Sequence, residues 1–368
     1  MEKNSVIDLF AGCGGFSIGF EKAGFRVTKA VEIDSQIAHT YSMNHEDVIM
    51  FNEDIGEIDN TNNFVEGETE VIIGGPPCQG FSMAGARIRK NGFMEDPRNY
   101  LFKHYVNVVK IVRPKVFVFE NVKGILSMKG GEIFREIVNT FSDPKNFDGD
   151  HYAISYKIVK AVEFGIPEKR ERVIIIGVLN KEIDLAQVEN KTRIQILKQY
   201  PHFFDKVTVG DAIIGLPKPT EDGVIKTPHP VNQYQEYIGS KCETLSNHKA
   251  TTHTEIALRR MHQIQDGQNW TSLDEEIHSV HSGAYGRMSW DEPSATITTR
   301  FDTPSGGRFT HPKEDRTITP REAARLQSFP DDFVFYGSKS SICKQIGNAV
   351  PPKLSFFIAN LIKNIIHE

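Results

Sequence analysis

The chain has few cysteines, and their spacing predicts neither a zinc site nor a disulfide framework. The four are Cys13, Cys78, Cys242 and Cys343; no two form a CxxC pair, and the sequence has no HExxH motif. Zinc sites depend on such closely spaced ligands, and disulfide scaffolds depend on a dense set of cysteines. We therefore expect no metal site in this protein.

Long apolar runs and a large excess of positive charge are also missing. No stretch approaches the ~20 apolar residues that a membrane-spanning helix requires, and residues 1–5 lack the apolar core of a secretion signal. The chain carries 43 Lys and Arg against 48 Asp and Glu. We therefore expect a cytoplasmic protein without membrane contact, in which a nucleic-acid partner would bind at a local basic cleft.

What the sequence does contain is enough chain for two globular domains, with 368 residues. Strand-like and helix-like segments alternate over residues 1–180, which predicts an α/β fold with a mostly parallel sheet covered by helices. Helices are expected at 100–112, at 132–141 and in a stretch ending near residue 22. Strands are expected at 6–9, 25–32, 48–51, 71–74, 116–120, 152–161 and 173–178.

Beyond residue 180 the periodicity weakens. Residues 185–290 are polar, with scattered His, Asn, Gln and Pro, and we expect a smaller, less regular domain over 181–330. Thr319 and Glu322 around Pro320 form the sequence of a helix-capping box. A last helix is expected from about 352 to 366, in a C-terminal segment, 331–368, that returns to the first domain.

The most informative segment is a cysteine loop after a buried-type strand. The apolar run 71–75 is followed by Pro76, Pro77, Cys78 and Gln79. The prolines stiffen the exit from the strand, and a thiolate on this loop could face a ligand at the carboxyl edge of the sheet. The alternative is a buried structural cysteine, which is chemically inert.

A glycine-rich turn joins the first expected strand to the first expected helix. It runs from Asp8 to Phe16 and has glycines at 12, 14 and 15. Glycines let the backbone approach a ligand closely, and a helix N-terminus follows. The dinucleotide pattern G-x-G-x-x-G fails because Ser17 occupies its last glycine position. A tight structural turn remains the alternative.

Two acids follow the next two strands. Glu32 ends the second strand, and Asp54 follows the third. A carboxylate at Glu32 could accept both ribose hydroxyls of a nucleoside cofactor, and Asp54 could take an adenine amino group. Either acid alone is as well explained by solvation at a strand end. Together with the glycine turn, they predict an adenosine-containing cofactor.

Glu120 and two arginines complete the candidate chemistry. Glu120 ends the fifth strand, at the same sheet edge as Cys78, where a carboxyl could donate a proton or bind a base edge. Arg170 and Arg172 project to one face of an extended segment and suit an anion or a carbonyl oxygen. The alternatives are an acid that caps a turn and a solvated run of charge.

Taken in order, these motifs resemble those of the cytosine-C5 DNA methyltransferases. The resemblance covers nearly the whole chain and implies a Rossmann-like S-adenosylmethionine-dependent methyltransferase domain with a mixed, mostly parallel sheet, plus a smaller, irregular target-recognition domain. One departure is Glu168, where the family more often has glutamine; we expect no loss of activity from it. The matching segments are 8–16, 75–82, 120–122, 170–172, 321–327 and 345–350, with Glu32 and Asp54 between them.

The resemblance also implies a mechanism. The target cytosine is flipped out of the duplex, and the Cys78 thiolate attacks its C6 so that C5 can accept the methyl group of S-adenosyl-L-methionine. Loss of the C5 proton and expulsion of Cys78 then release the product. Glu120 would hold the N3/N4 edge of the base. Arg172 would contact its O2, with Arg170 beside it.

Further residues are assigned to two ligands by the same resemblance. The cofactor would be held by Asp8, Phe10, Ala11, Gly12, Gly14, Gly15, Phe16, Glu32, Ile33, Asp54, Ile55, Pro76, Leu101, Asn348 and Ala349. Double-stranded DNA would be contacted by Gln79, Ser82, Arg87, Arg98, Tyr285, Arg287, Thr298 and Arg300.

We therefore expect a DNA (cytosine-5)-methyltransferase of the bacterial restriction-modification type. It would be a monomer in the bacterial cytoplasm or nucleoid, and it could protect DNA beside a restriction endonuclease or act alone. Three alternatives stay open: a tRNA methyltransferase of the same family, a DNA-binding relative without catalysis, and a dinucleotide oxidoreductase. The polar segment 185–290 disfavours the first. Intact Cys78, Glu120 and Arg172 disfavour the second, and Ser17 and the cysteine loop disfavour the third.

Overall fold

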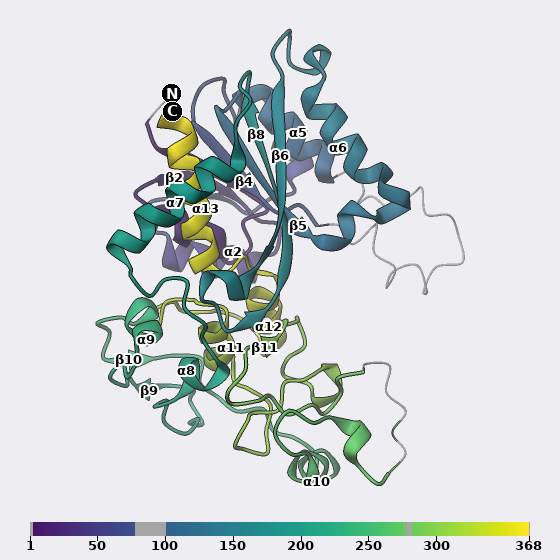
Figure 1. The fold of residues 1–368 in the computed structure, drawn as a ribbon, viewed down its shortest axis with the longest axis vertical. Coiled ribbons are helices and arrows are strands. Elements are labelled where there is room, and N and C mark those ends of the chain that lie inside the picture. Colours follow the sequence, from purple (N-terminus) through teal and green to yellow (C-terminus); the bar gives the residue numbers. More distant parts are fainter. Residues whose placement is uncertain (1–2, 78–100, 276, 278–281, 368) are drawn as a thin grey trace. The chain divides into compact units, whose positions relative to one another are not determined.

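The computed structural model describes residues 3–77, 101–275, 277 and 282–367 (Figure 1). The chain divides into two compact units. The first consists of Met1–Val159, Glu171–Gln199 and Ser355–Glu368, and the second of Lys160–Arg170 and Tyr200–Leu354. Among the described residues, no helix is both long and apolar enough to cross a membrane.

A seven-stranded mixed sheet forms the centre of the first unit, with strand order β3-β2-β1-β4-β5-β8-β6. The pairs β1–β2, β1–β4, β2–β3 and β4–β5 are parallel, and β5–β8 is antiparallel. This arrangement confirms the expected α/β class, and the expected strand ends are shifted by at most two residues. The strands are β1 (Ser5–Leu9), β2 (Arg26–Val31), β3 (Ile49–Phe51), β4 (Val71–Gly74), β5 (Val116–Val122), β6 (Tyr152–Lys160) and β8 (Glu171–Leu179).

Some helices of the first unit match the expected ones, and α2, α3 and α7 are additional. Helices expected from the sequence near 22, at 100–112 and at 132–141 correspond to α1, α5 and α6. The set comprises α1 (Gly15–Lys22), α2 (Ser35–Asn44), α3 (Ile55–Ile58), α5 (Leu101–Val112), α6 (Glu132–Ser142), α7 (Leu185–Gln199) and α13 (Pro352–His367).

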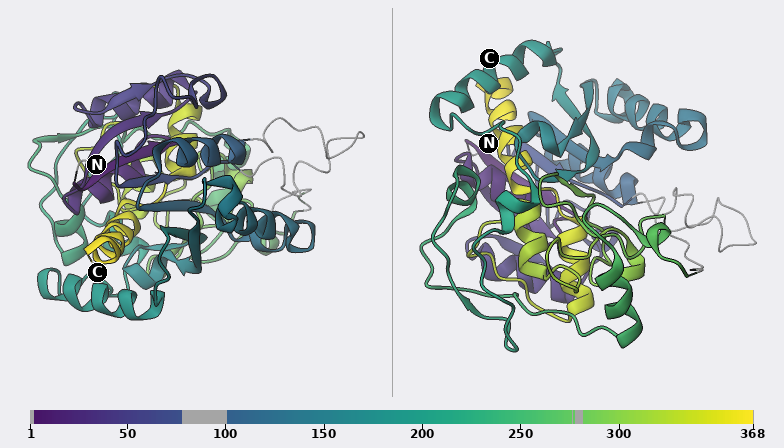
Figure 2. Two further views of the ribbon diagram at one scale, coloured as in Figure 1. Left: turned by 90° about the horizontal axis from the view of Figure 1, so that it is seen from above. Right: turned by 60° about the horizontal axis from the view of Figure 1, so that its bottom comes forward.

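The last helix, α13, belongs to the first unit from Ser355 onward, whereas residues 331–354 of the expected C-terminal segment lie in the second unit; the helix lies against α1. Ser355 Oγ donates a hydrogen bond to the carbonyl of Phe16, and Lys363 Nζ donates to the carbonyl of Ala23 at 3.1 Å. Helix α7 lies beside α13 (Figure 2), and Asn364 Nδ2 of α13 donates to Thr192 Oγ1 of α7 at 2.9 Å. This packing explains why α7, which we expected beyond the domain boundary at residue 180, belongs to the first unit.

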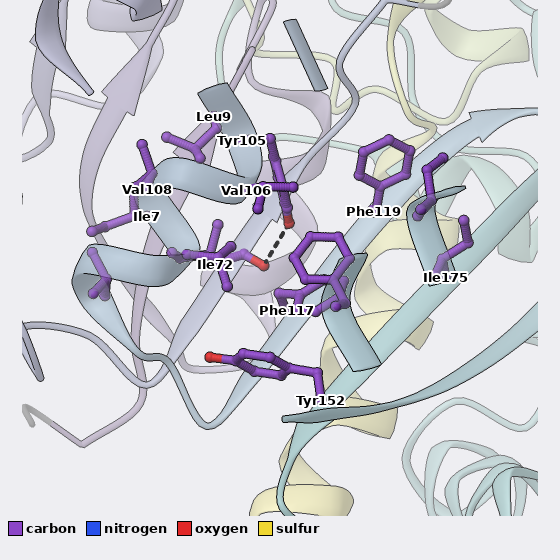
Figure 3. Close-up of a cluster of buried hydrophobic side chains, with 14 of the residues drawn as sticks. Ile7, Leu9, Ile72, Tyr105, Val106, Val108, Phe117, Phe119, Tyr152 and Ile175 are labelled. Carbon is purple, nitrogen blue, oxygen red and sulfur yellow. Dashed lines mark hydrogen bonds between the residues drawn. The ribbon is translucent and has the colours of Figure 1, made fainter. Parts of the chain in front are cut away.

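The hydrophobic core of the first unit lies between the sheet and helices α5 and α6 (Figure 3). Tyr105 of α5 is fully buried there among the aromatic rings of Phe117 and Phe119. Its hydroxyl donates to the carbonyl oxygen of Val118 at 3.0 Å. A buried tyrosine hydroxyl needs such a partner, and the bond fixes α5 over the centre of the sheet.

The second unit has short elements joined by long irregular segments, as the weak periodicity predicted. Its helix α11 (Pro320–Leu326) begins with the expected capping box, in which Thr319 and Glu322 bond reciprocally. The other elements are α8 (Val209–Ile213), α9 (Gln233–Ile238), α10 (Glu255–Gln263), α12 (Lys339–Asn348), β7 (Glu168–Lys169), β9 (Ile225–Lys226), β10 (Thr244–Leu245) and β11 (Ser294–Ala295).

Buried charge holds this second unit together. Arg325 forms a bidentate pair with Asp331, and Arg316 pairs with Glu322 at 2.8 Å. Burial alone would raise the pKa of Glu322, but hydrogen bonds and charge from Arg316 outweigh it and lower the pKa to about 2. Arg321 donates to three main-chain carbonyls, those of Ser246, Pro330 and Phe333. These arginines hold distant segments of the small unit together.

Candidate active site

The glycine-rich turn after β1 adopts a backbone conformation that requires glycine. Gly12 and Gly14 have φ values of 57° and 97°, in the left-handed region that most side chains avoid. A Cβ on Gly14 would stand 2.3 Å from Nε2 of His45, so no side chain fits there. The turn leads directly into α1, whose first N–H groups have no intrahelical acceptor and can face a ligand.

Glu32 connects this turn to the end of β2. One carboxylate oxygen accepts a hydrogen bond from the N–H of Gly12 at 3.1 Å, and the other accepts from the N–H of Asp34 at 2.9 Å. A carboxylate can accept about four hydrogen bonds, which is more than these two backbone donors use. Glu32 is therefore held in a fixed orientation in which it could also accept hydroxyl groups of a ribose.

Ile33 and Asp54 lie at the ends of the neighbouring strands β2 and β3. Ile33 is 65% exposed, which is unusual for a large apolar side chain next to a buried strand. Asp54 is exposed and caps α3 by accepting from the N–H of Gly56 at 2.9 Å. An exposed apolar side chain and an exposed carboxylate that follow neighbouring strands suit a purine ring with an amino group. Ile55, in contrast, is buried and contributes to the core.

Asp8 lies below the turn and is 1% exposed. Tyr41 and Ser17 extend from it in a chain of hydroxyl groups: Ser17 Oγ donates to Asp8 Oδ2 at 2.7 Å and lies 2.8 Å from the Tyr41 hydroxyl. Burial raises the pKa of Asp8 to about 7. We expected Asp8 to touch the cofactor directly, but its bond to Ser17 and its burial place it as a support for the turn. Phe16 is likewise buried.

Glu120 and Arg172 come together on the neighbouring strands β5 and β8. Nε of Arg172 lies 2.9 Å from Oε1 of Glu120. Oε1 is buried, and although it forms this ion pair by distance, it accepts no well-aligned hydrogen bond from the described residues. A buried oxygen of this kind is expected to receive a donor from a ligand. A Cβ on Gly75 would stand 3.0 Å from Oε2, so glycine leaves the room that this carboxylate occupies.

Asn121 is a site residue that the sequence reasoning did not single out. It is 4% exposed, and its Nδ2 donates to the carbonyl oxygen of Pro76 at 3.0 Å. Its Oδ1 accepts from the N–H of Val122 at 2.8 Å. The side chain thus ties the end of β5 to the chain that leaves β4. The sequence does carry a signal for it, because Asn121 directly follows Glu120 in segment 120–122, one of the segments that resemble the family.

Several residues predicted for catalysis and DNA contact lie outside the described part of the chain. These are Cys78, Gln79, Ser82, Arg87 and Arg98. Their roles stay predictions from the sequence.

Arg170 belongs to the second unit and has other partners than Arg172. It is 2% exposed, and its two amino groups donate to the carbonyl oxygens of Gly347 and Ala349 at 3.1 and 3.0 Å. We expected Arg170 beside Arg172 at the base. The structure instead engages its amino groups with the main chain on both sides of Asn348.

Residues predicted to contact DNA differ in how accessible they are. Arg287 is buried and makes five hydrogen bonds, to four carbonyl oxygens and Asp315, so its guanidinium has no donor left for a phosphate. We therefore no longer propose it as a DNA contact. The side chain of Arg300 is 67% exposed. Tyr285 is half-buried and accepts from Arg260, while Thr298 lies at the start of the Arg300 turn.

Comparison with known proteins identifies the class. The family model described as "C-5 cytosine-specific DNA methylase" matches residues 4–364, and the chain belongs to this family. It is therefore a DNA cytosine-C5 methyltransferase with S-adenosyl-L-methionine as methyl donor. The tRNA alternative is not favoured, because the similar curated proteins are DNA methyltransferases. Membership of this family also rules out the oxidoreductase alternative.

Among individual relatives, the chain is 35% identical to the Type II methyltransferase M1.HphI of Haemophilus parahaemolyticus over 363 residues, 97% of this chain and 86% of the relative. It is 34% identical to M.DdeI of Desulfomicrobium norvegicum, covering 97% and 88%. A putative DNA modification methyltransferase encoded within a prophage of E. coli has the same fold, with a TM-score of 0.74, 29% identity and 99% coverage of both chains.

Proposed function

We propose that this enzyme methylates C5 of one cytosine within a short specific sequence of double-stranded DNA, with Cys78 as nucleophile and Glu120 and Arg172 as the groups that hold the base. The observation that carries the proposal is the Glu120–Arg172 pair, whose Oε1 is buried and accepts no well-aligned hydrogen bond from the described residues. Along its pairing edge a cytosine presents the N4 amino group as donor and N3 and O2 as acceptors, and this pair offers an acceptor for the amino group beside a cation for O2.

In this proposal the two side chains bind different atoms along the edge of the base. The Glu120 carboxylate accepts from the N4 amino group and supports a proton on N3, so that negative charge does not build up on the ring during attack of the thiolate at C6. Nε of Arg172 is paired with Glu120, and one of its amino groups donates to the carbonyl of Glu171 at 2.8 Å. Its other amino group can donate to the O2 atom of the base.

The methyl donor would be held by polar groups at the carboxyl edge of the sheet. The bound donor supplies an electrophilic methyl group. Glu32 fits the ribose, since both its oxygens are already oriented by backbone N–H groups. Ile33 and Asp54 fit the purine, and Asp8 holds the glycine turn from below. Phe10, Ala11, Gly15, Pro76, Leu101, Asn348 and Ala349 stay proposed contacts from the resemblance.

The biological setting is proposed from the relatives. Because the similar curated proteins are named Type II methyltransferases, we propose that the enzyme protects bacterial DNA against a restriction endonuclease of the same specificity. We further propose that it acts as a monomer in the cytoplasm or nucleoid. Analytical ultracentrifugation tests the monomer. Digestion of the methylated product with nucleases that cut at the methylated sequence tests the protection.

The main experiment measures methyl transfer from labelled S-adenosyl-L-methionine to unmethylated genomic DNA, followed by bisulfite sequencing. Wild type should methylate cytosine in one short sequence context, and Cys78→Ala should not. A matched control is Cys242→Ala, which changes a half-buried cysteine of the second unit and should leave transfer intact. Transfer by Cys78→Ala at the wild-type rate would overturn the assignment of the nucleophile.

A further inference from the structure

The C-terminal end of α12 is held by a side chain from a distant part of the second unit. Helix α12 ends at Asn348, and its last carbonyl groups have no donor within the helix. Arg170 supplies donors to two carbonyls there, those of Gly347 and Ala349, which flank Asn348 on both sides. Asn348 itself is exposed. The main chain around Asn348 is therefore fixed while its amide stays accessible.

Glu168 supplies the charge that a buried guanidinium requires. It is fully buried, and its Oε1 lies 3.6 Å from the nearer amino group of Arg170. The same oxygen accepts a hydrogen bond from the N–H of Ile297 at 2.7 Å. A buried charge is tolerated only with a partner, so the two side chains act as a pair. The pair links β7 to both the Ile297 segment and the end of α12.

The Gly347 backbone is also confined on its other side. A Cβ at this position would stand 2.5 to 2.7 Å from main-chain atoms of Thr298 and Thr299, so the two segments are in direct contact. With Arg170 on one side and the Thr298 main chain on the other, the turn at 347–349 has little freedom to move. A ligand that binds the exposed Asn348 amide then meets a preorganised group and loses less entropy.

We propose that Arg170 is a positioning residue of the cofactor site, acting through the main chain around Asn348, and that it does not touch the target cytosine. Glu168 is the buried countercharge of Arg170, and this is the role of the glutamic acid at position 168. This inference rests on the proposed function in one respect, the assignment of Asn348 to S-adenosyl-L-methionine.

The test measures the affinity of the purified full chain for S-adenosyl-L-methionine by calorimetry, without DNA. Arg170→Lys keeps the charge but cannot reach both carbonyls, and it should weaken binding roughly tenfold, the effect of one lost charge-assisted hydrogen bond. The matched control is Arg321→Lys, because Arg321 is equally buried and also donates to carbonyl oxygens, but around residues 246, 330 and 333. It should bind the cofactor like wild type.

A double-variant cycle with Asn348→Ala makes the test specific. If Arg170 acts through Asn348, then adding Arg170→Lys to Asn348→Ala should weaken binding no further. Fully additive losses would overturn the proposal. So would unchanged cofactor affinity with a reduced kcat at saturating cofactor, since that pattern indicates a contact with the base.

A second variant guards against misfolding. Glu168→Gln/Arg170→Gln removes both buried charges together, so no charge is left without a partner, and it should lose the same affinity as Arg170→Lys. Wild-type affinity in this double variant would contradict the proposal. Binding is measured without DNA, so the two proposals can fail separately. A wild type that binds the cofactor but leaves DNA unmodified would contradict the proposed function, while the binding data would still test the role of Arg170.

Discussion

Glu120 and Arg172 lie on antiparallel strands in the diagonal register that long side chains can bridge. Residue 120 pairs with 174, and residue 122 pairs with 172. Glu120 and Arg172 are therefore diagonal neighbours whose side chains lie on the same face of the sheet. Nε of Arg172 consequently comes within 2.9 Å of Oε1 of Glu120. The pairing of β5 with β8 thus places an acid beside a cation at a position fixed by the main chain.

Replacement of Glu120 by glutamine should abolish most of the activity while the protein stays folded. The amide has the size of the carboxylate but cannot support a proton on the base, and general acid–base groups contribute roughly 10² to 10⁴ in rate. We expect kcat to fall by at least about 10²-fold, with unchanged affinity for S-adenosyl-L-methionine. Steady-state kinetics and calorimetry on the same preparation measure both.

The matched control for that variant is Glu171→Gln. Glu171 is a half-buried carboxylate on β8 that pairs with Lys123 at 3.0 Å, and we assign it no contact with the base. Its amide should retain nearly full activity. If both variants lost activity to the same extent, the effect of Glu120 would be one of general charge around β8 and our assignment of its role would be wrong.

Asn121→Asp should separate positioning of the cysteine loop from cofactor binding. The change removes the Nδ2 donor and brings a carboxylate oxygen toward the carbonyl of Pro76, at a cost of about 1–3 kcal/mol. Because Pro76 leads into the loop of Cys78, kcat should fall roughly tenfold or more, with cofactor affinity retained. The comparison is Asn146→Asp, which breaks a similar 3.0 Å bond to the carbonyl of Thr140. It should lower stability alone; an equal loss of kcat there would contradict our view.

The sequence allowed the sheet and the glycine turn to be predicted because both follow from short-range patterns. Apolar runs marked the strands, and Gly12 and Gly14 marked a backbone that only glycine adopts readily. The different partners of Arg170 and Arg172 were beyond such reasoning, because Gly347 and Glu120 are brought to them by the fold. The burial of Arg287 and of Asp8 also depends on contacts between distant segments, and polar residues in a loop give no sign of it.

Arg300→Ala should weaken DNA binding in a way that depends on salt and not on sequence. The side chain of Arg300 is 67% exposed; it lies 3.9 Å from Asp302 and donates to Thr303 Oγ1 at 3.1 Å, which leaves further N–H groups of the guanidinium for a phosphate. Loss of one phosphate contact lowers the slope of log affinity against log salt concentration by about 0.9. Fluorescence anisotropy with unmethylated duplexes at several salt concentrations measures that slope.

Arg26→Ala serves as the comparison for Arg300→Ala. Arg26 is exposed at the amino end of β2, whereas the candidate residues gather at the carboxyl ends of the strands. Its removal should leave the slope unchanged. An unchanged slope for Arg300→Ala would remove this residue from the DNA interface, and a loss confined to one sequence would indicate contact with a base edge instead.

Asp8→Asn should alter how the stability of the first unit depends on pH. Burial raises the pKa of Asp8 to about 7; the hydrogen bond from Ser17 opposes this shift, and the charges of Glu21 and Glu32 add to it. Since the pKa of an aspartate in the unfolded chain is ~3.9, the folded state binds the proton more tightly. The stabilisation from this group is complete below pH ~4 and is lost as the pH rises through about 7.

Urea unfolding of wild type and Asp8→Asn at pH 5, 6, 7 and 8 tests this sign. Asparagine does not ionise. The wild type should therefore lose on the order of 2 kcal/mol of its free energy of unfolding, relative to the variant, between pH 5 and pH 8, because a tenfold difference in proton affinity corresponds to ~1.4 kcal/mol. Asp47→Asn, at an exposed aspartate of the same unit, should follow the wild type at every pH. Parallel curves for wild type and Asp8→Asn would show that Asp8 is ionised throughout this range. The group that supports the glycine turn and bonds to Ser17 would then be a buried carboxylate and not a protonated carboxyl.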